Sequence, residues 1–193
     1  MREAIRSELA AARDTLERTL DSESVLESLE RAVELSVAAL EGEGRILLAG
    51  NGGSAADSQH LAAELVVRLH DERRPLAAIA LTTDTSILTA AANDYGAEHL
   101  FERQVTALGR RGDVLIAIST SGNSPNILRA ADAARAGGLS VVAFTGEGGG
   151  RLAERADCAV RVPSRETQHV QEAHIALGHA LCLLVERRLT GGR

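Results

Sequence analysis

The stretch Gly50-Asn51-Gly52-Gly53-Ser54 lies between a short apolar run, 45–49, and a segment of helical period that begins at Ala55. This order of residues predicts a strand, a glycine turn and a helix. Glycines let the backbone approach a ligand closely, and the first amides of a helix carry partial positive charge. We expect Ser54 to add its hydroxyl as the N-cap residue. The stretch therefore predicts a βα unit that binds an anion.

Strand-like and helical segments alternate along the rest of the chain. Most of the strand-like segments are apolar runs, which is typical of a parallel sheet covered by helices on both faces. We expect an α/β fold with five parallel strands in a single domain that spans residues 1–193. The further strands are expected at 76–81, 113–118, 139–144 and 158–162, and the longer helices at 84–92, 97–108, from Pro125, and at 166–189.

Two amphipathic helices are expected ahead of this core, at 2–20 and 23–41. An apolar stripe of this kind needs a partner, so we expect residues 1–41 to join subunits in a homo-oligomeric helix bundle. The alternative is a helical cap on the same subunit. The stripe residues are Ile5, Leu9, Leu16 and Leu20 in the first helix and Leu26, Leu29, Val33, Val37 and Leu40 in the second, with Val25 beside the second stripe.

The composition argues against several classes of partner. With 27 acidic residues and 21 arginines, the net charge is −6, which disfavours binding to a nucleic-acid backbone. The N-terminus is charged where a signal peptide needs an apolar run, and no stretch reaches the length of a membrane span. We expect a cytoplasmic protein whose Cys158 and Cys182 are buried thiols.

A second polar cluster, Ser119-Thr120-Ser121-Gly122-Asn123-Ser124, follows the third expected strand. Its four hydroxyls and helix-start amides suit the phosphate of a sugar phosphate, and the cluster carries no fixed positive charge. The alternative is a turn that only caps its own helix, but capping needs one hydroxyl. Because ligands bind at the carboxyl ends of parallel strands, we expect this cluster and the glycine turn to share one cleft.

A dinucleotide site is the competing interpretation of the glycine turn. Gly50-x-Gly52-x-x-Ala55 matches the G-x-G-x-x-G/A fingerprint. However, Asp84 lies much further along than the roughly 20 residues expected for the carboxylate that binds the ribose. No Gly-Lys-Ser/Thr follows the glycines, which excludes a P-loop. We therefore expect no nucleotide cofactor.

Two helices carry the other chemical groups. His60 and Glu64 are four residues apart, and Gln171 and His179 are eight apart, so each pair lies on one helix face. If the two helices face each other, these side chains form a shell for a divalent metal, and the histidines favour zinc. The alternative for His60 and Glu64 alone is a solvated surface pair, but the neighbouring glycine turn directs their helix at the cleft.

Together these motifs resemble the phosphoheptose isomerases of the SIS (sugar isomerase) superfamily, and the resemblance covers essentially the whole chain. It implies a flavodoxin-like sheet, a homotetramer and conversion of sedoheptulose 7-phosphate to D-glycero-D-manno-heptose 7-phosphate, the first step toward ADP- or GDP-heptose for lipopolysaccharide or other surface glycans. It also implies one zinc ion per subunit, held at His60, Glu64, Gln171 and His179. The substrate contacts would lie at Asn51, Gly52, Gly53, Glu64, Asn93, Asp94, Ser119, Thr120, Ser121, Ser124 and Gln171, and Ser54 joins them through the glycine turn.

The chemistry of a carbonyl shift assigns two of these residues. Moving a carbonyl between C1 and C2 needs one group that takes a proton from carbon and another that moves protons between the oxygens. We expect Glu64 as the base at carbon and His179 as its acid/base partner, with an enediolate between them.

Alternatives remain within the same superfamily. The chain also resembles the DiaA-type homotetramers that bind the bacterial replication initiator, and sensors or isomerases of other phosphosugars. That DiaA branch does not retain the carboxylate and imidazole together at the positions of Glu64 and His179, whereas this chain has both. At Gln168 and His169 the chain differs from the family pattern, which often has arginine in place of His169.

Overall fold

The computed structural model describes residues 1–191 as a five-stranded parallel sheet with helices on both faces. The strand order is β2-β1-β3-β4-β5, and every neighbouring pair is parallel. This confirms the predicted α/β architecture. The strands are β1 Ile46–Ala49, β2 Ala78–Ala80, β3 Val114–Ile118, β4 Ser140–Gly146 and β5 Cys158–Val162. The helices are α1 Arg2–Leu20, α2 Glu23–Glu41, α3 Gly53–Val66, α4 Thr85–Tyr95, the 3₁₀ turn η1 Ala97–His99, α5 Glu102–Leu108, α6 Pro125–Gly137, α7 Gly150–Ala153 and α8 Thr167–Thr190.

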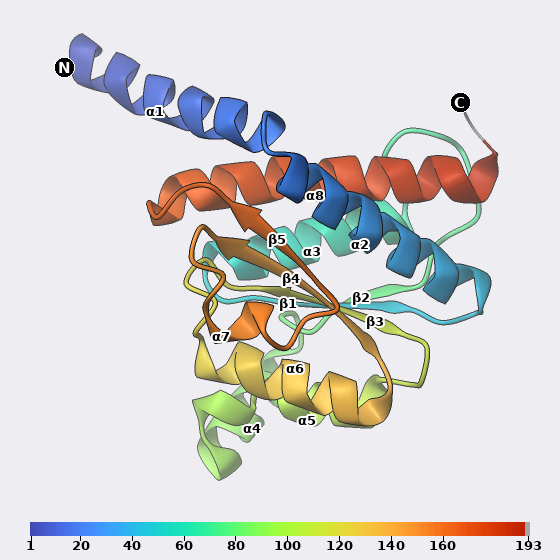
Figure 1. Cartoon of the computed structure of the whole chain (residues 1–193). Helices are drawn as coiled ribbons and strands as arrows, with labels where there is room; N and C mark the ends of the chain where they lie inside the picture. The colour runs from blue at the N-terminus through green and yellow to red at the C-terminus, as the bar shows by residue number, and fades with distance from the viewer. Residues whose placement is uncertain (192–193) are drawn as a thin grey trace.

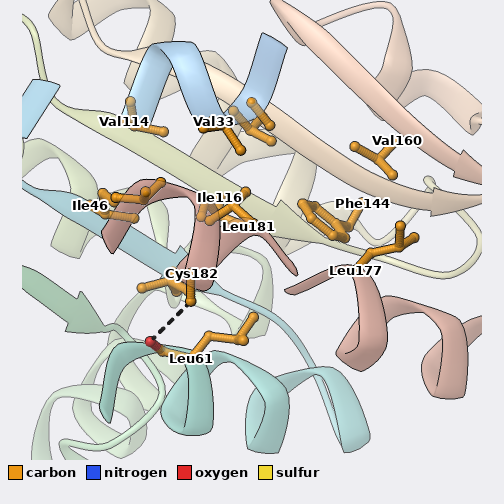
Figure 2. Packing of buried hydrophobic residues seen from close by; sticks show 14 of the residues in the cluster. Val33, Ile46, Leu61, Val114, Ile116, Phe144, Val160, Leu177, Leu181 and Cys182 are labelled. Carbon is orange, nitrogen blue, oxygen red and sulfur yellow. Dashed lines mark hydrogen bonds between the residues drawn. The ribbon is translucent and has the colours of Figure 1, made fainter. Parts of the chain in front are cut away.

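Alternating strand residues build two cores, one on each face of the sheet. In β1, Ile46 and Leu48 point to the face covered by α2, α3 and α8, while Leu47 points to the face covered by α5 and α6. Figure 1 shows these two helical layers above and below the sheet. In Figure 2, Ile116 and Phe144 of the first core lie among side chains from α8. Because both faces are covered, most of the strands are apolar runs, as the sequence indicated, and the exposed Arg161 lies on the edge strand β5.

The element boundaries differ from the predicted ones in several places. β2 covers only Ala78–Ala80 of the strand expected at 76–81. The helix expected at 84–92 continues to Tyr95 and ends before Gly96. The φ of Gly96 is 96°, which residues other than glycine rarely adopt. The helix expected at 97–108 is split into η1 and α5. β4 extends to Gly146 because its last residues pair with Arg161 and Val162 of β5.

The two N-terminal helices form as predicted, but they are packed very differently. α2 lies against β5 and α8, and it buries Val25 rather than Leu26, which corrects the predicted stripe. Adjacent residues are about 100° apart on a helix, so the roll of α2 against the sheet decides which of the two is buried. In α1 the stripe residues Ile5, Leu9, Leu16 and Leu20 are exposed, and Figure 1 shows the helix extending away from the sheet.

Within residues 1–191, no helix has both the length and the apolar character that crossing a membrane requires. Cys158 and Cys182 are both free thiols. Cys182 is buried as expected, whereas Cys158 on the edge strand β5 is only partly buried, which corrects the prediction for that residue. Burial raises the pKa of Cys158 to about 11 and that of Cys182 to about 12.

A buried imidazole lies in the core between α8 and β4. The ring of His174 packs edge-on against Phe144, and its Nε2 donates to the carbonyl oxygen of Thr145 at 3.0 Å. Burial lowers the pKa of His174 to about 4, although this hydrogen bond opposes the shift. His174 is therefore neutral in the folded protein over a range in which the unfolded chain binds a proton.

This difference predicts a pH dependence of stability. The contribution of His174 to the free energy of unfolding is fully present above pH 6.5. It is lost as the pH falls toward 4, because the unfolded state takes up the proton first. From the size of the pKa shift, the largest loss in unfolding free energy is about 3 kcal/mol. His174→Gln should flatten the profile of unfolding free energy against pH in this window, measured by chemical denaturation. The exposed His70 is the control, and an equal flattening in His70→Gln would contradict the assignment.

Candidate active site

The strand order reverses at β1, and this reversal creates the cleft. The chain passes from β1 to β2 on one side and later enters β3 on the other side of β1. The loops that follow β1 and β3 therefore part at the carboxyl edge of the sheet, the usual ligand position in open α/β folds. These are the glycine loop, residues 50–53, and the serine loop, residues 119–124, which the sequence predicted to share a cleft.

The glycine loop brings backbone rather than side chains to the cleft. A Cβ on Gly50 would lie 2.4 Å from the carbonyl oxygen of Ser54, so the turn excludes a side chain there. Gly52, with φ of 54°, is the N-cap of α3. The prediction that Ser54 is the N-cap is wrong: the positive φ of Gly52 lets the helix begin at Gly53, and Ser54 is buried inside the first turn. The N–H groups of Gly53 and Ser54 lie at the open end of the helix.

The serine loop is held by hydrogen bonds of its hydroxyls and by a second glycine-rich turn. Ser119 Oγ and Ser124 Oγ lie 3.0 Å apart, and Ser121 Oγ accepts from the N–H of Asn123 at 3.1 Å. Ser124 is the N-cap of α6, but its side chain does not bond to the helix amides. Its hydroxyl faces Ser119, so the loop is more than a cap for its own helix.

The turn at 146–150 and the start of α7 pack against the serine loop and fix its shape. The N–H of Leu152 donates to the carbonyl of Gly122 at 2.9 Å. A Cβ on Gly150 would lie 2.5 Å from the carbonyl oxygen of Ser121, and φ at Gly150 is 56°. Glycine at this position therefore permits the contact between the two loops.

The two loops line a cavity of about 240 Å³. A larger hollow of about 550 Å³ shares Asn51 and Ser124 with it and extends to Glu98 and Arg129. Asn51 and Asn126 exchange two amide hydrogen bonds, of 3.0 and 2.8 Å, which tie the glycine loop to α6. The smaller cavity is lined by Asn51, Gly52, Gly53, Ser54, Ile118, Ser119, Thr120, Ser124, Thr167 and Gln171.

α3 and α8 bring three titratable side chains together. The Nε2 atoms of His60 and His179 lie 2.7 Å apart, and His60 Nε2 is 3.4 Å from Glu64 Oε1. One potential ligand atom from each of the three residues lies within 4.8 Å of the others. Two imidazole nitrogens and a carboxylate oxygen converging on one point are a typical donor set for zinc. The donor chemistry and spacing of the three residues therefore fit a small divalent cation.

Gln171 lies about two turns before His179 on α8. Its amide covers Gly53, since a Cβ on that glycine would lie 2.7 Å from Gln171 Nε2. It thus lines the small cavity beside the glycine loop. The structure joins His60, Glu64 and His179 in one cluster and places Gln171 against the smaller cavity.

Asn93 and Asp94 lie apart from this group. Both are exposed on the last turn of α4, where Asn93 Nδ2 donates to Asp94 Oδ1 at 2.7 Å. The two side chains line neither of the two cavities described above. Gln168 is likewise exposed, and His169 is buried with its Nδ1 2.9 Å from Glu172 Oε2.

Sequence reasoning missed Asp57, which lies one turn before His60 on α3. Its Oδ2 is buried and makes no hydrogen bond to any residue that the structure describes. Burial raises the pKa of Asp57, while the imidazoles of His60 and His179 act in the opposite direction. The spacing 57, 60, 64 places all three residues on one helical face and was available as a signal.

Comparisons with known proteins agree with this geometry. The SIS domain model matches residues 9–146. The chain is 50% identical over 187 residues to the phosphoheptose isomerase of Burkholderia pseudomallei, covering 97% of this chain and 95% of the relative. It is 56% identical over 162 residues to that of Rhodospirillum rubrum, covering 84% and 86%. The chain belongs to the phosphoheptose isomerase family.

Solved structures extend the same match to three dimensions. The phosphoheptose isomerase GmhA from Neisseria gonorrhoeae superimposes with a TM-score of 0.90 at 44% identity, covering 96% of this chain and 98% of that one. The two N-terminal helices are thus part of the shared architecture, since the alignment covers almost the full length of both chains.

The contact between the two loops yields a prediction with a control in the same turn. Gly150→Ala should distort the serine loop, because a side chain at positive φ costs about 1–3 kcal/mol and its Cβ would meet the Ser121 carbonyl. Calorimetry should show weaker binding of inorganic phosphate. A Cβ on Gly148 would meet no heavy atom within 4 Å, so Gly148→Ala should bind phosphate normally. Equal affinities in the two variants would contradict the proposed role of the turn.

Proposed function

We infer that this chain is a phosphoheptose isomerase that converts sedoheptulose 7-phosphate to D-glycero-D-manno-heptose 7-phosphate. The observation that carries this inference is the cluster of His60, Glu64 and His179 on α3 and α8, the two helices that also bring Gly53 and Gln171 to the small cavity. The chain is also 50% identical to a phosphoheptose isomerase. Such a reaction supplies the first precursor of ADP- or GDP-heptose. The two free thiols are consistent with a cytoplasmic enzyme.

The phosphate is proposed to bind in the smaller cavity. The hydroxyls of Ser119, Thr120 and Ser124 line it. The backbone N–H groups at the open N-terminus of α3 would donate to the phosphate. Ser121 and the amide of Gln171 complete the proposed contacts. The adjoining hollow beside Asn51 offers space for the sugar chain. The family resemblance supports Asn93 and Asp94 as further substrate contacts, which requires the end of α4 to approach the site.

The proposed chemistry uses two groups of the cluster. Glu64 takes the proton from C1 of the ketose and returns it to C2, and His179 moves the hydroxyl proton between O2 and O1. The C1–H and O1–H bonds are therefore broken, the C2–H and O2–H bonds are formed, and the carbonyl moves from C2 to C1, with no net transfer to a cofactor. Asp57, whose buried oxygen faces no protein donor among the described residues, is close enough to influence both imidazoles.

Zinc is proposed as the metal of the site. His60, Glu64 and His179 would hold it, and Gln171 is the fourth ligand that the family resemblance implies. When bound, zinc would polarise the oxygens of the substrate as a Lewis acid. The support is the donor set and its spacing.

A homotetramer is proposed for the assembly, with residues 1–41 as oligomerisation helices of a single SIS domain at 1–193. The support is the exposed stripe of α1, because contiguous apolar surface is rare on monomers.

The choice of Glu64 as base predicts a separation between catalysis and binding. Glu64→Gln keeps the size of the side chain and removes the base, so kcat should fall by at least about 10²–10⁴ while sugar-phosphate binding persists. Ser124→Ala should instead raise KM with a smaller fall in kcat. In heavy water, the aldose should acquire deuterium at C2 to the extent that Glu64 exchanges with solvent. Near-normal turnover in Glu64→Gln would reject Glu64 as the base.

The metal proposal predicts loss and recovery of activity. Chelation should inactivate the enzyme and added zinc should restore it, because the polarising cation is removed and returned. His60→Ala should reduce zinc content, measured by elemental analysis, more than it weakens phosphate binding. Full activity in protein shown to be metal-free would reduce the cluster to a hydrogen-bonded acid/base group.

The assembly proposal predicts that the stripe of α1 holds subunits together. Leu9→Glu should shift the particle mass from tetramer toward smaller species in light scattering, because a charge cannot be buried there without a partner. Ser7→Glu, which adds the same charge at an exposed position on the opposite face of α1, is the control. A wild-type monomer at micromolar concentration would contradict the proposal.

A further inference from the structure

A buried ion pair connects α8 with the loop that follows α3. Glu186 of α8 is fully buried, and its carboxylate accepts from the backbone N–H groups of Leu69, His70 and Asp71 at 3.2, 3.0 and 2.7 Å. Arg73 donates to the same carboxylate from Nε at 3.0 Å. The carboxylate thus orders a loop that has no regular secondary structure of its own.

Arg73 continues this connection into α3. Its side chain is almost fully buried, and Nη2 donates at 2.8 Å to the backbone carbonyl of Glu64. A second nitrogen, Nη1, donates to the carbonyls of Arg74 at 3.1 Å and Val67 at 3.4 Å. The guanidinium therefore caps the last turn of α3, the turn that carries Glu64, where the helix dipole favours a positive charge.

Three residues at four-residue intervals along one side of α8 contact α3 or the loop that follows it. A Cβ on Gly178 would lie 2.7 Å from Leu61 Cδ1, so the absence of a side chain permits close approach. Four residues later, Cys182 Sγ lies 3.9 Å from the Leu61 carbonyl, the dashed line in Figure 2. Glu186 follows after four more. The neighbours of Gly178 and Leu61 are His179 and His60, so this packing sets the distance between the two imidazoles.

We propose that Arg73 and Glu186 are positioning residues for the cluster of His60, Glu64 and His179. They fix the position of the C-terminal end of α3 along the axis of α8, and this aligns Glu64 and His60 with His179. The inference rests on the proposed function, since it assigns these two residues to the same site. A buried ion pair contributes little net stability compared with apolar side chains, whereas its directional bonds specify one arrangement.

The chain offers a matched control at the opposite edge of the sheet. Asp113 is buried, accepts from the N–H groups of Arg45 and Arg110 at 2.9 Å each, and lies 3.6 Å from the guanidinium of Arg45. It precedes β3, whereas the site lies beyond the carboxyl end of that strand. Asp113→Asn therefore removes a similar buried charge without touching α3 or α8.

The test compares Arg73→Lys, Glu186→Gln and Asp113→Asn below their melting temperatures. The zinc Kd of metal-stripped protein is measured by chelator competition, together with kcat and KM. Arg73→Lys keeps a positive charge but loses the fork that reaches the Glu64 carbonyl. It should weaken zinc binding by about 10–100-fold, as removal of groups that orient ligands does, and lower kcat more than it raises KM. Asp113→Asn should lower the melting temperature and leave the zinc Kd and kcat unchanged.

Hydrogen exchange of the α3 amides at 61–66 provides a readout that needs no metal. Exchange should accelerate in Arg73→Lys and Glu186→Gln but not in Asp113→Asn. Wild-type zinc affinity, kcat and exchange in Arg73→Lys would overturn the positioning role, even if Glu186→Gln fails to fold. A wild-type protein without zinc binding or isomerase activity would instead overturn the proposed function, and the exchange data would still decide whether the ion pair holds α3.

Discussion

The reversal of strand order at β1 is the constraint on which the site depends. Because β2 and β3 lie on opposite sides of β1, the loops after β1 and β3 diverge and leave the carboxyl edge open. The following helices, α3 and α6, go to opposite faces of the sheet. Their N-termini therefore approach the same opening from different layers, and the glycine and serine loops share one cavity.

The two halves of the site use different physical means. At the loops, hydroxyls and backbone amides surround a space with no charged side chain among its lining residues in the described chain. Neutral donors of this kind suit an anion that must be released after each turnover. At α3 and α8, by contrast, imidazole and carboxylate groups gather at the point where the proposed reaction moves protons. Substrate and product of an isomerase differ only near the carbonyl, so one phosphate anchor at the proposed position would serve both.

The junction of α3 with α8 determines how well this second half is formed. A glycine, a cysteine and a buried glutamate on α8 bring the helices close, and Arg73 fastens the end of α3. Each of these residues belongs to the protein interior rather than to the cleft. A site assembled from two helices thus depends on interior contacts as much as on its own side chains, because a small shift of either helix changes the spacing between ligand atoms.

The sequence alone determined the succession of strands and helices along the chain, the positions of the glycine and serine loops, and the face shared by His60 and Glu64. These features depend on local rules: apolar runs, glycine-rich turns and the helical repeat. It did not determine that Gly52 rather than Ser54 caps α3, that Val25 is buried in place of Leu26, or that Asn93 and Asp94 lie within a helix. Nor did it identify Asp57, or the link from Glu186 through Arg73 to Glu64. Those outcomes depend on how elements far apart in the chain pack together, because burial and hydrogen bonding at each position are decided by neighbours that no local pattern specifies.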